Sequence, residues 1–480
     1  MSTIPIRIAL AEALRLAAQE RAAGRFAEAA ALLDAVREAA PASAAVQQEL
    51  ALLAFMQGRL AEALALARQA VAAEPERAGW WRNLCTIAER CGAYPLALEA
   101  ALQATTRDPS LADHWHALAV VEYRLQRLPE CIAHARAALA RDPAHPGAHV
   151  LLGEARLAGG DFAGAWEDYA WRFRLAGRPP VAPVLGCPEW DGAPLRAGTL
   201  LLVADQGYGD TIQNARFLPW AAARAPAAAL VAAPEIAPLL ARVLPEAAVF
   251  TGWEQVAGHC AGLAAWAPLS ELPRLAGIDP ARIPAPASYL RADPDTAAHW
   301  RARRAALVPP SEGPPEGPPV RPREARREAP PARCVGLVWA GRPTHPNDAS
   351  RSAPPAALTP LAAVPGVRLV SLQRGPTAAA AAAPGAAAWG EEIAHFGDLA
   401  GAIAALDLLI SVDSAPAHLA GALGRPVWTM LPYGADWRWG MAGETTAWYP
   451  SMRLFRPAAP RDWTGVLGQV TAALADWASP

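Results

Sequence analysis

The feature that most constrains this chain is a 34-residue period in its N-terminal third. Two sets of residues mark the period: Gly24, Gly58, Gly92 and Gly160, and Pro41, Pro75, Pro109 and Pro143. Gln126 stands at the one step where the glycine is missing. Two independent marks that share one spacing indicate an array of structural repeats.

Helical spacing fills the stretches between these marks, as in Phe26, Ala30 and Leu33. Each glycine stands where one helix turns into the next, and each proline follows the second helix and stops it. Trp81 and Trp115 fall at the same place in successive repeats. A helix pair cannot bury its apolar face alone, so the stack is the folding unit. Residues 8–178 resemble about five tetratricopeptide repeats, which implies a superhelix whose concave face binds a peptide or protein partner.

A different pattern begins at residue 179. Buried strands alternate with amphipathic helices over 179–308 and again over 334–480, and this alternation predicts parallel sheets covered by helices. The segment 309–333 is too rich in proline, glycine and charge to pack, so we predict a flexible linker there. In such open sheets ligands bind beyond the carboxyl ends of the strands.

The basic residues exclude several kinds of chemistry. All 43 of them are arginine, so the chain cannot supply the lysine of a P-loop, a kinase or a Schiff-base enzyme. A coding bias explains this absence without any reference to function, because asparagine is also rare, with three in 480 residues. In either case an anion must be held by arginine, by hydroxyls or by helix N-termini.

The remaining composition excludes some partners and compartments. A net charge of −2 argues against nucleic-acid binding. The six cysteines show no CxxC spacing, so neither a metal site nor a disulfide framework is predicted. The N-terminus lacks the pattern of a signal peptide, and charged residues or prolines interrupt the most apolar stretches, so no transmembrane segment is predicted. We expect a cytoplasmic protein and leave open its peripheral association with the inner membrane.

The first candidate loop, 205–211, follows a predicted strand and contains Gly207, Gly209 and Asp210. The two glycines allow a ligand to approach the backbone, but the third glycine of a dinucleotide fingerprint is missing. Asp210 lies at the start of the next helix, where a carboxylate commonly caps the helix. The alternative is that Asp210 faces the cleft between the two α/β halves and acts as a general base toward a sugar hydroxyl.

The second candidate loop, 339–352, follows the first strand of the second half. Arg342 and Arg351 are the available guanidinium groups for a phosphate, with Asn347 and Ser352 as supporting donors. The alternative is a solvated loop in which an arginine pairs with Asp348.

Two more loops end strands in the second half. Gln373 could contact a base or a ribose, although a lone glutamine is a weak signal. Asp413 and Ser414 end a strand just before a helix whose N-terminus suits a diphosphate. His418 lies one turn into that helix, near enough to face the same ligand, although a lone histidine is more often a packed or capping residue.

Taken together, these loops resemble the glycosyltransferase half of bacterial tetratricopeptide-repeat glycosyltransferases, which are related to the ADP-heptose:lipopolysaccharide heptosyltransferases. The resemblance rests on GYGDTIQNARFLPW, LVWAGRPTHPNDASRS, VSLQRGP, LLISVDSAPAHLAGALGRPVW and DWRW followed by WYPSMRLFR. It implies a GT-B fold of two Rossmann-like halves, with the acceptor on the first and the nucleotide sugar on the second. It also implies metal-independent transfer, with the nucleotide-diphosphate sugar as co-substrate and no cofactor.

The same resemblance implies roles for particular residues. Asp210 matches the presumed base of the heptosyltransferase Gly-Asp motif, and Asp413, Ser414 and His418 match the Asp-Ser/Thr-x-x-x-His motif of the donor-binding helix. Heptosyltransferases commonly place a lysine near the donor phosphates, in the loop after the first strand of the second half. Here Arg351 or Arg342 must replace that lysine.

The function expected from the sequence is therefore inverting transfer of a sugar to a hydroxyl of a glycan or protein acceptor. Two alternatives stay open. One is a non-catalytic repeat scaffold with a degenerate nucleotide-sugar-binding domain. The other is a protein O-glycosyltransferase whose repeats bind the polypeptide acceptor, similar in layout to O-linked N-acetylglucosamine transferases.

Overall fold

The computed structural model describes residues 10–177, 180–259, 262–307, 332–344, 348–375 and 385–479. The chain divides into two compact units. One contains the chain up to Gly159 with Glu167–Ala176, and the other contains Gly160–Trp166 with Gly177–Pro480. The predicted linker 309–333 lies outside the described residues except for its last two positions.

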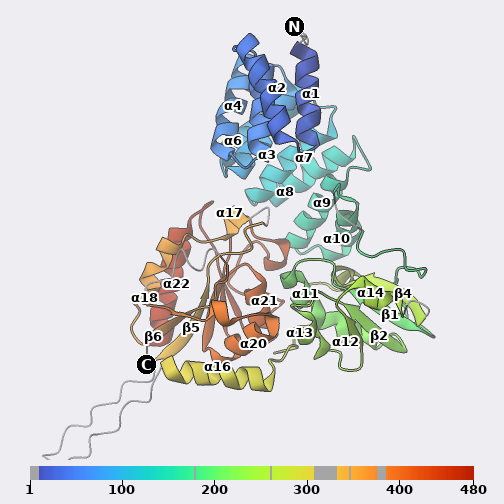
Figure 1. The fold of residues 1–480 in the computed structure, drawn as a ribbon, viewed down its shortest axis with the longest axis vertical. Coiled ribbons are helices and arrows are strands. Elements are labelled where there is room, and N and C mark those ends of the chain that lie inside the picture. The colour runs from blue at the N-terminus through green and yellow to red at the C-terminus, as the bar shows by residue number, and fades with distance from the viewer. Residues whose placement is uncertain are drawn as a thin grey trace, which may run out of the picture. The chain divides into compact units, whose positions relative to one another are not determined.

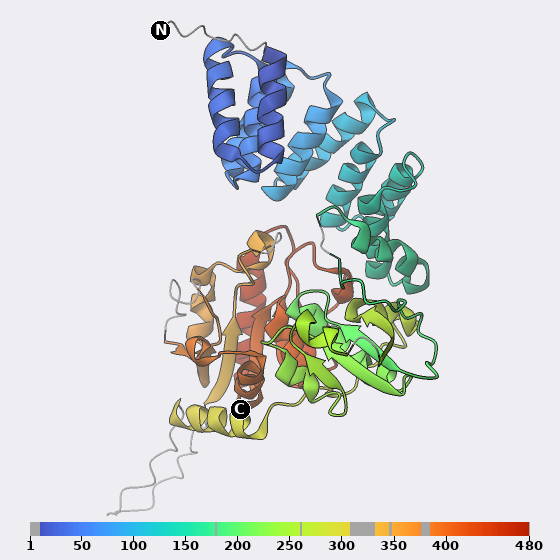
Figure 2. The same cartoon turned by 45° about the vertical axis from the view of Figure 1, so that its right-hand side comes forward.

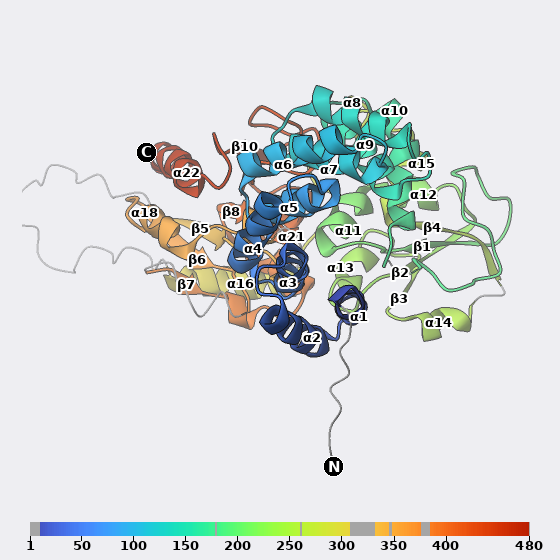
Figure 3. The same cartoon turned by 90° about the horizontal axis from the view of Figure 1, so that it is seen from above.

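The first unit is a stack of antiparallel helix pairs, drawn in blue to teal in Figure 1. Its helices are α1 (Leu10–Ala22), α2 (Phe26–Ala39), α3 (Ala44–Met56), α4 (Leu60–Ala73), α5 (Ala78–Arg90), α6 (Tyr94–Arg107), α7 (Ala112–Arg124), α8 (Leu128–Leu139) and α9 (Pro146–Ala158), followed by α10 (Phe162–Tyr169), which spans the boundary between the units. Fully buried alanines fill the crossings within the pairs, so the two backbones of a pair can approach closely. Seen from above in Figure 3, successive pairs follow a curve.

The turn within each pair depends on one residue in the left-handed region. The four periodic glycines have φ between 71° and 86°, a conformation that glycine adopts without steric cost. Gln126 has φ 61°, so it adopts the same turn without being glycine.

Three of the periodic prolines also have a structural role, because the carbonyl oxygen of each contacts a ring nitrogen of a side chain in the next helix. The contacts join Trp81 Nε1 to Pro75 O at 2.7 Å, Trp115 Nε1 to Pro109 O at 2.9 Å and His149 Nε2 to Pro143 O at 2.9 Å. Together with the positive-φ turns, they confirm a tetratricopeptide-type superhelix.

The second unit begins with a four-stranded parallel sheet. Its strands are β1 (Thr199–Val203), β2 (Ala227–Val231), β3 (Ala248–Phe250) and β4 (Leu263–Pro268), in the order β3-β2-β1-β4. The helices that connect or follow them are α11 (Tyr208–Asn214), α12 (Leu218–Ala222), α13 (Ala237–Ala241), α14 (Trp253–Ala257) and α15 (Leu272–Leu275). The order reverses between β1 and β4, so a topological switch point lies at their carboxyl ends.

The second sheet is parallel and six-stranded, and its order is β10-β9-β8-β5-β6-β7. The strands are β5 (Arg333–Val338), β6 (Val367–Ser371), β7 (Ala387–Ala388), β8 (Leu408–Val412), β9 (Val427–Met430) and β10 (Met452–Phe455). The helices of this half are α17 (Asp348–Arg351), α18 (Thr359–Ala362), α20 (Phe396–Ala405), α21 (Ala415–Ala422) and α22 (Trp463–Ala478). Figure 3 labels most strands of both sheets in this order. Counted from β5, the order is that of a Rossmann sheet, with a switch point between β5 and β8. The expected pair of Rossmann-like halves after a repeat superhelix is therefore confirmed.

Helix α16 (Pro294–Leu307), yellow in Figure 2, packs on α20 of the second half. The sequence interpretation grouped this segment with the first half. The physical reason for its position is Trp300, which is 2% exposed. Its indole lies 4.9 Å from the ring of Trp389 and against Gly401, where a side chain would clash.

Candidate active site

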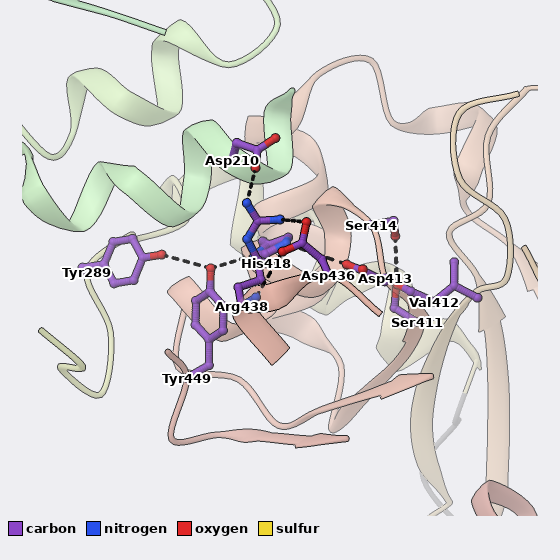
Figure 4. A network of polar contacts seen from close by, with 10 residues as sticks. All are labelled: Asp210, Tyr289, Ser411, Val412, Asp413, Ser414, His418, Asp436, Arg438 and Tyr449. Atoms are coloured by element: carbon purple, nitrogen blue, oxygen red, sulfur yellow. Dashed lines mark hydrogen bonds and ion pairs between the residues drawn. The ribbon is translucent and has the colours of Figure 1, made fainter. Parts of the chain in front are cut away.

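Asp210 lies in the first turn of α11, just beyond the carboxyl end of β1. It is not the helix cap, because the N-cap residue of α11 is Gly207. Its Oδ1 instead accepts a hydrogen bond of 2.7 Å from Nη2 of Arg438, and its side chain is 25% exposed. The carboxylate is thus turned toward the second half and remains reachable by a ligand (Figure 4).

Arg438 belongs to a short 3-10 helix, Trp437–Trp439, in the segment between β9 and β10. Its Nη1 lies 2.7 Å from Oδ2 of Asp436, and its backbone N–H donates to Oδ1 of the same residue at 3.1 Å. Asp436 is the N-cap of that helix, so one carboxylate fixes both the backbone and the side chain of Arg438. The arginine side chain is 13% exposed.

Gly209 allows the two halves to approach, because α11 packs on α21 of the second half. A Cβ atom at Gly209 would lie 2.9 Å from Cδ2 of His418. At Gly207 a Cβ would meet nothing closer than 3.4 Å. The sequence predicts that Gly209 lets a ligand approach the backbone. In the structure, the imidazole of His418 lies in the space beside Gly209.

His418 is buried on α21, beneath Gly209. Its Nδ1 lies 2.9 Å from the Tyr449 hydroxyl, and its Nε2 lies 4.0 Å from Oδ1 of Asp413. Burial, together with the positive charges of Arg438 and Arg216, holds the pKa of His418 well below its usual value. The imidazole is therefore neutral at neutral pH, and it serves as a hydrogen-bonding group and not as a cation.

Asp413 follows β8 at the switch point, with 16% of its side chain exposed. Burial, reinforced by the negative charge of Asp436, raises the pKa of Asp413 to about 6, and the positive charge of Arg438 opposes this rise. This carboxyl group therefore titrates close to neutral pH.

Ser414 is the N-cap residue of α21, but its hydroxyl does not cap the helix. The hydroxyl donates to the carbonyl of Val412 at 3.1 Å and lies 3.2 Å from Oγ of Ser411. An anion at the start of α21 would therefore meet the backbone and the helix dipole first.

The loop after β5 brings Arg351 and Ser352 together. Nε of Arg351 lies 3.6 Å from Oδ1 of Asp348, and the guanidinium packs against the backbone of Gly341. The Ser352 hydroxyl donates to Asp348 at 2.9 Å and accepts from the N–H of Gly341 at 3.0 Å. The alternative contact of an arginine with Asp348 is thus present, and Arg351 is also close enough to lower the pKa of Asp413.

The other predicted residues of these loops are placed less centrally. Arg342 is exposed, and its charge acts on Tyr208 of the first half. Asn347 lies outside the described residues. Gln373 is 5% exposed, and its Oε1 accepts from the backbone N–H groups of Trp339 and Ala340 at 3.1 and 3.0 Å. This glutamine holds the start of the loop after β5.

Arg216 was not predicted from the sequence, yet it joins the two halves. It is 6% exposed and donates to the carbonyl of Trp448 at 2.7 Å and to that of Pro284 at 3.0 Å. Its guanidinium also lies over the rings of Tyr289 and Tyr449, at 4.8 and 4.7 Å. Because Tyr449 contacts His418, Arg216 also helps to position His418 through Tyr449.

Arg438 and Asp436 were also missed as site residues. The DWRW motif that contains them contributed to the family resemblance, but no role was assigned to its members. The available signal was position, because the motif follows β9, and carboxyl ends of parallel strands meet at one edge of the sheet. In the described parts of the chain, no three His, Cys, Asp or Glu side chains gather in a way that could hold a metal ion.

Three family models match parts of the chain. Tetratricopeptide-repeat models match residues 20–82 and 116–170. The model of glycosyltransferase family 9 (heptosyltransferase) matches residues 393–447, a segment that includes Asp413, His418 and Arg438. At the family level these matches support repeats followed by a glycosyltransferase domain, as the sequence predicted.

A curated relative extends the similarity beyond these segments. The chain is 30% identical over 358 residues to Protein FlbA of Caulobacter vibrioides. The alignment covers 69% of this chain and 54% of the relative, so the chain spans about half the length of the protein that it matches.

Several solved structures match about a third of this chain. The tetratricopeptide protein TTC0263 of Thermus thermophilus is 24% identical, covers 35% of this chain and 93% of its own, and has a TM-score of 0.31. PilF of Pseudomonas aeruginosa is 17% identical, with coverages of 35% and 78% and a TM-score of 0.33. MamA of Desulfovibrio magneticus RS-1 is 16% identical, with coverages of 34% and 91% and a TM-score of 0.31.

Among the helices that the structure describes, none combines the length and apolar character needed to span a bilayer.

Proposed function

We propose that this protein is a metal-independent, inverting glycosyltransferase that moves a sugar from a nucleotide-diphosphate donor to a hydroxyl of a glycan or protein acceptor. The observation that carries the proposal is the position of Asp210. Its partly exposed carboxylate bonds to Arg438, which lies in the segment that matches glycosyltransferase family 9. The proposed base of the first half thus contacts a residue in the segment of the second half that matches the glycosyltransferase model.

In the proposed reaction, Asp210 takes the proton of the acceptor hydroxyl as that oxygen attacks the anomeric carbon. A new bond forms between the acceptor oxygen and the anomeric carbon. The bond from that carbon to the donor's β-phosphate oxygen breaks, and its electron pair leaves with the nucleoside diphosphate. Attack from the face opposite the leaving group inverts the anomeric centre.

The donor side of the site would lie at the carboxyl ends of β5 and β8. The N-terminus of α21, after Asp413 and Ser414, offers backbone N–H groups and the positive end of a helix dipole to the diphosphate. The positive charge of Arg351 acts on Asp413, so it would also act on an anion bound there. Arg342 is exposed and its charge acts on Tyr208, so it is the second guanidinium group proposed for a phosphate or the ribose.

The test is the Asp210→Asn variant, which keeps the shape of the side chain and removes its basicity. We expect turnover with a panel of nucleotide sugars to fall by at least about a hundredfold, while binding of the nucleoside diphosphate persists. The matched control is Asp295→Asn, an exposed carboxylate in the first turn of α16. Unchanged turnover in Asp210→Asn would refute the role of Asp210.

The acceptor class needs a separate measurement. The tetratricopeptide matches favour contact with another protein, which supports a polypeptide acceptor or a docking partner. With a radiolabelled donor, label that ends in precipitated protein supports protein glycosylation, and label in a saccharide fraction supports a glycan acceptor. If no donor of the panel is transferred or hydrolysed, the scaffold alternative gains support.

A further inference from the structure

The charges around Arg438 are unusual for a site that would bind a diphosphate. Its guanidinium contacts the carboxylates of Asp210 and Asp436, each at 2.7 Å, and its charge also reaches Asp413 and His418. Figure 4 shows these groups in one network that spans both halves. Two carboxylates therefore contact the guanidinium, and its charge acts on a third, at the edge of the sheet where the donor is proposed to bind.

The ion pair also restrains the proposed base. Oδ1 of Asp210 is occupied by the strongest kind of hydrogen bond, from a guanidinium group. The lone pair of Oδ1 that accepts this hydrogen bond is not available to a hydroxyl proton while Arg438 holds it. Transfer of the acceptor's proton to this position would therefore require Arg438 to release Oδ1 of Asp210.

We propose that Arg438 binds the diphosphate of the donor and that it does so by exchanging Asp210 for a phosphate oxygen, so that donor binding releases the base. The inference rests on the proposed function. No bond other than hydrogen bonds changes in this step. Asp436 keeps its contacts with Nη1 and with the backbone, so the arginine turns about a fixed anchor.

The exchange is physically reasonable because phosphate and carboxylate oxygens compete for the same planar group of donors. Arg438 is 13% exposed, so its ion pairs are only weakly screened by solvent. Arg351, by comparison, packs against Gly341 and lies 3.6 Å from Asp348, which restrains its movement. In a chain without lysine, Arg438, which already contacts the base, is thus better placed than Arg351 to serve both the base and the leaving group.

The exchange predicts effects of opposite sign in two variants. ADP, GDP, UDP and CDP are titrated into the full-length protein by calorimetry, and the best of them is used throughout. Arg438→Gln should weaken its binding by at least about tenfold, because the charged partner of the phosphate is lost. Asp210→Asn should tighten binding by about threefold or more, because the competing carboxylate has lost its charge. The double variant should bind as weakly as Arg438→Gln alone.

A purely structural role for Arg438 cannot produce this pattern, since both single variants would then weaken binding. Arg438→Lys keeps the charge without the planar donors and should fall between the wild type and Arg438→Gln. The matched control is Arg368→Gln, an exposed arginine on β6, which should leave binding unchanged.

The outcomes separate this inference from the proposed function. If Arg438→Gln binds the nucleotide as tightly as the wild type does, or if Asp210→Asn binds it more weakly, the exchange is overturned. The glycosyltransferase proposal then still stands. A wild-type protein that binds none of the four nucleotides overturns both. Should Arg438→Gln fail to fold, the sign of the change in Asp210→Asn still decides.

Discussion

Asp210 and Arg438, 228 positions apart in the chain, are joined by a 2.7 Å ion pair between the two α/β halves. The pair forms where α11 packs on α21, and Gly209 of α11 lies against His418 of α21 there. Neither half contains the site by itself. The candidate active site is a product of the interface between them.

The close approach at Gly209 predicts a specific sensitivity to a single methyl group. In Gly209→Ala the new Cβ would lie 2.9 Å from the imidazole of His418, so this buried ring or the backbone around it must shift. We expect the free energy of unfolding to fall by about 1–3 kcal/mol, as for other overpacked contacts. Denaturant unfolding of the full chain measures it.

The neighbouring Gly207→Ala is the matched control. Its φ of −61° suits any residue, and the nearest atom to the new Cβ is 3.4 Å away. We expect a loss of less than about 1 kcal/mol, attributable to the helix cap. Equal losses in the two variants would show that the interface does not depend on the space at Gly209.

The raised pKa of Asp413 predicts a pH-dependent stability. Its pKa in the folded protein is about 6, above the ordinary value of 3.8, because of burial and the charge of Asp436. The folded state therefore holds this proton more tightly than the unfolded state does. Between pH 4 and pH 6 the contribution of Asp413 to the free energy of unfolding decreases as pH rises, and above pH 7 it no longer changes.

The measurement is the difference in the free energy of unfolding between the wild type and Asp413→Asn across pH 4–8. From the acid to the neutral end, the wild type should lose up to about 3 kcal/mol relative to the variant. Asp476→Asn, at an exposed position on α22, supplies the reference. If the difference in the free energy of unfolding between the wild type and Asp413→Asn stays constant with pH, it would contradict the burial of an ionisable carboxyl group at this position.

Much of the fold could be predicted because its signals are local. A left-handed turn every 34 residues selects glycine, and a proline ends each second helix, so the sequence itself displays the period. The alternation of apolar strands and helices displays the two Rossmann-like halves in the same way. The position of α16 was not predictable, because it depends on where Trp300 finds a partner in Trp389, 89 residues later.

The candidate site was predicted in part for the same reason. Asp210, Asp413 and His418 follow strands within their own loops, so the rule about strand ends could find them. The structure brings all three close to Arg438. The role of Arg438 was not visible, because a pairing across 228 positions leaves no local pattern. The loop contacts of Gln373 were equally invisible, since the groups that donate to its side chain are backbone N–H groups.

Gln373 predicts a loss of stability that a purely ligand-contacting residue would not show. Its Oε1 serves two buried backbone N–H groups, those of Trp339 and Ala340. Gln373→Leu removes that acceptor, so we expect the free energy of unfolding to fall by about 2 kcal/mol. The exposed Gln469→Leu should change it by less than about 0.5 kcal/mol. Unaltered stability in Gln373→Leu, combined with weaker nucleotide binding, would instead support the ligand role that the sequence suggested.

The repeat unit allows a test in which one substitution is the reverse of another. Gln126 has φ 61° where the other repeats have glycine. A side chain in that region costs about 1 kcal/mol, partly offset by the greater freedom of glycine in the unfolded chain. Gln126→Gly should therefore stabilise its helix pair by up to about 1 kcal/mol.

The reverse change, Gly58→Gln, introduces a side chain at φ 76°, where a Cβ meets no atom within 4 Å. Its cost is then conformational and not a clash, and we expect a loss of about 1 kcal/mol. Amide hydrogen exchange in α3 and α4 for Gly58→Gln, and in α7 and α8 for Gln126→Gly, reports the two effects locally. Faster exchange in Gln126→Gly would mean that contacts of the Gln126 side chain outweigh its backbone conformation, and that this repeat is held by a different balance of forces from its neighbours.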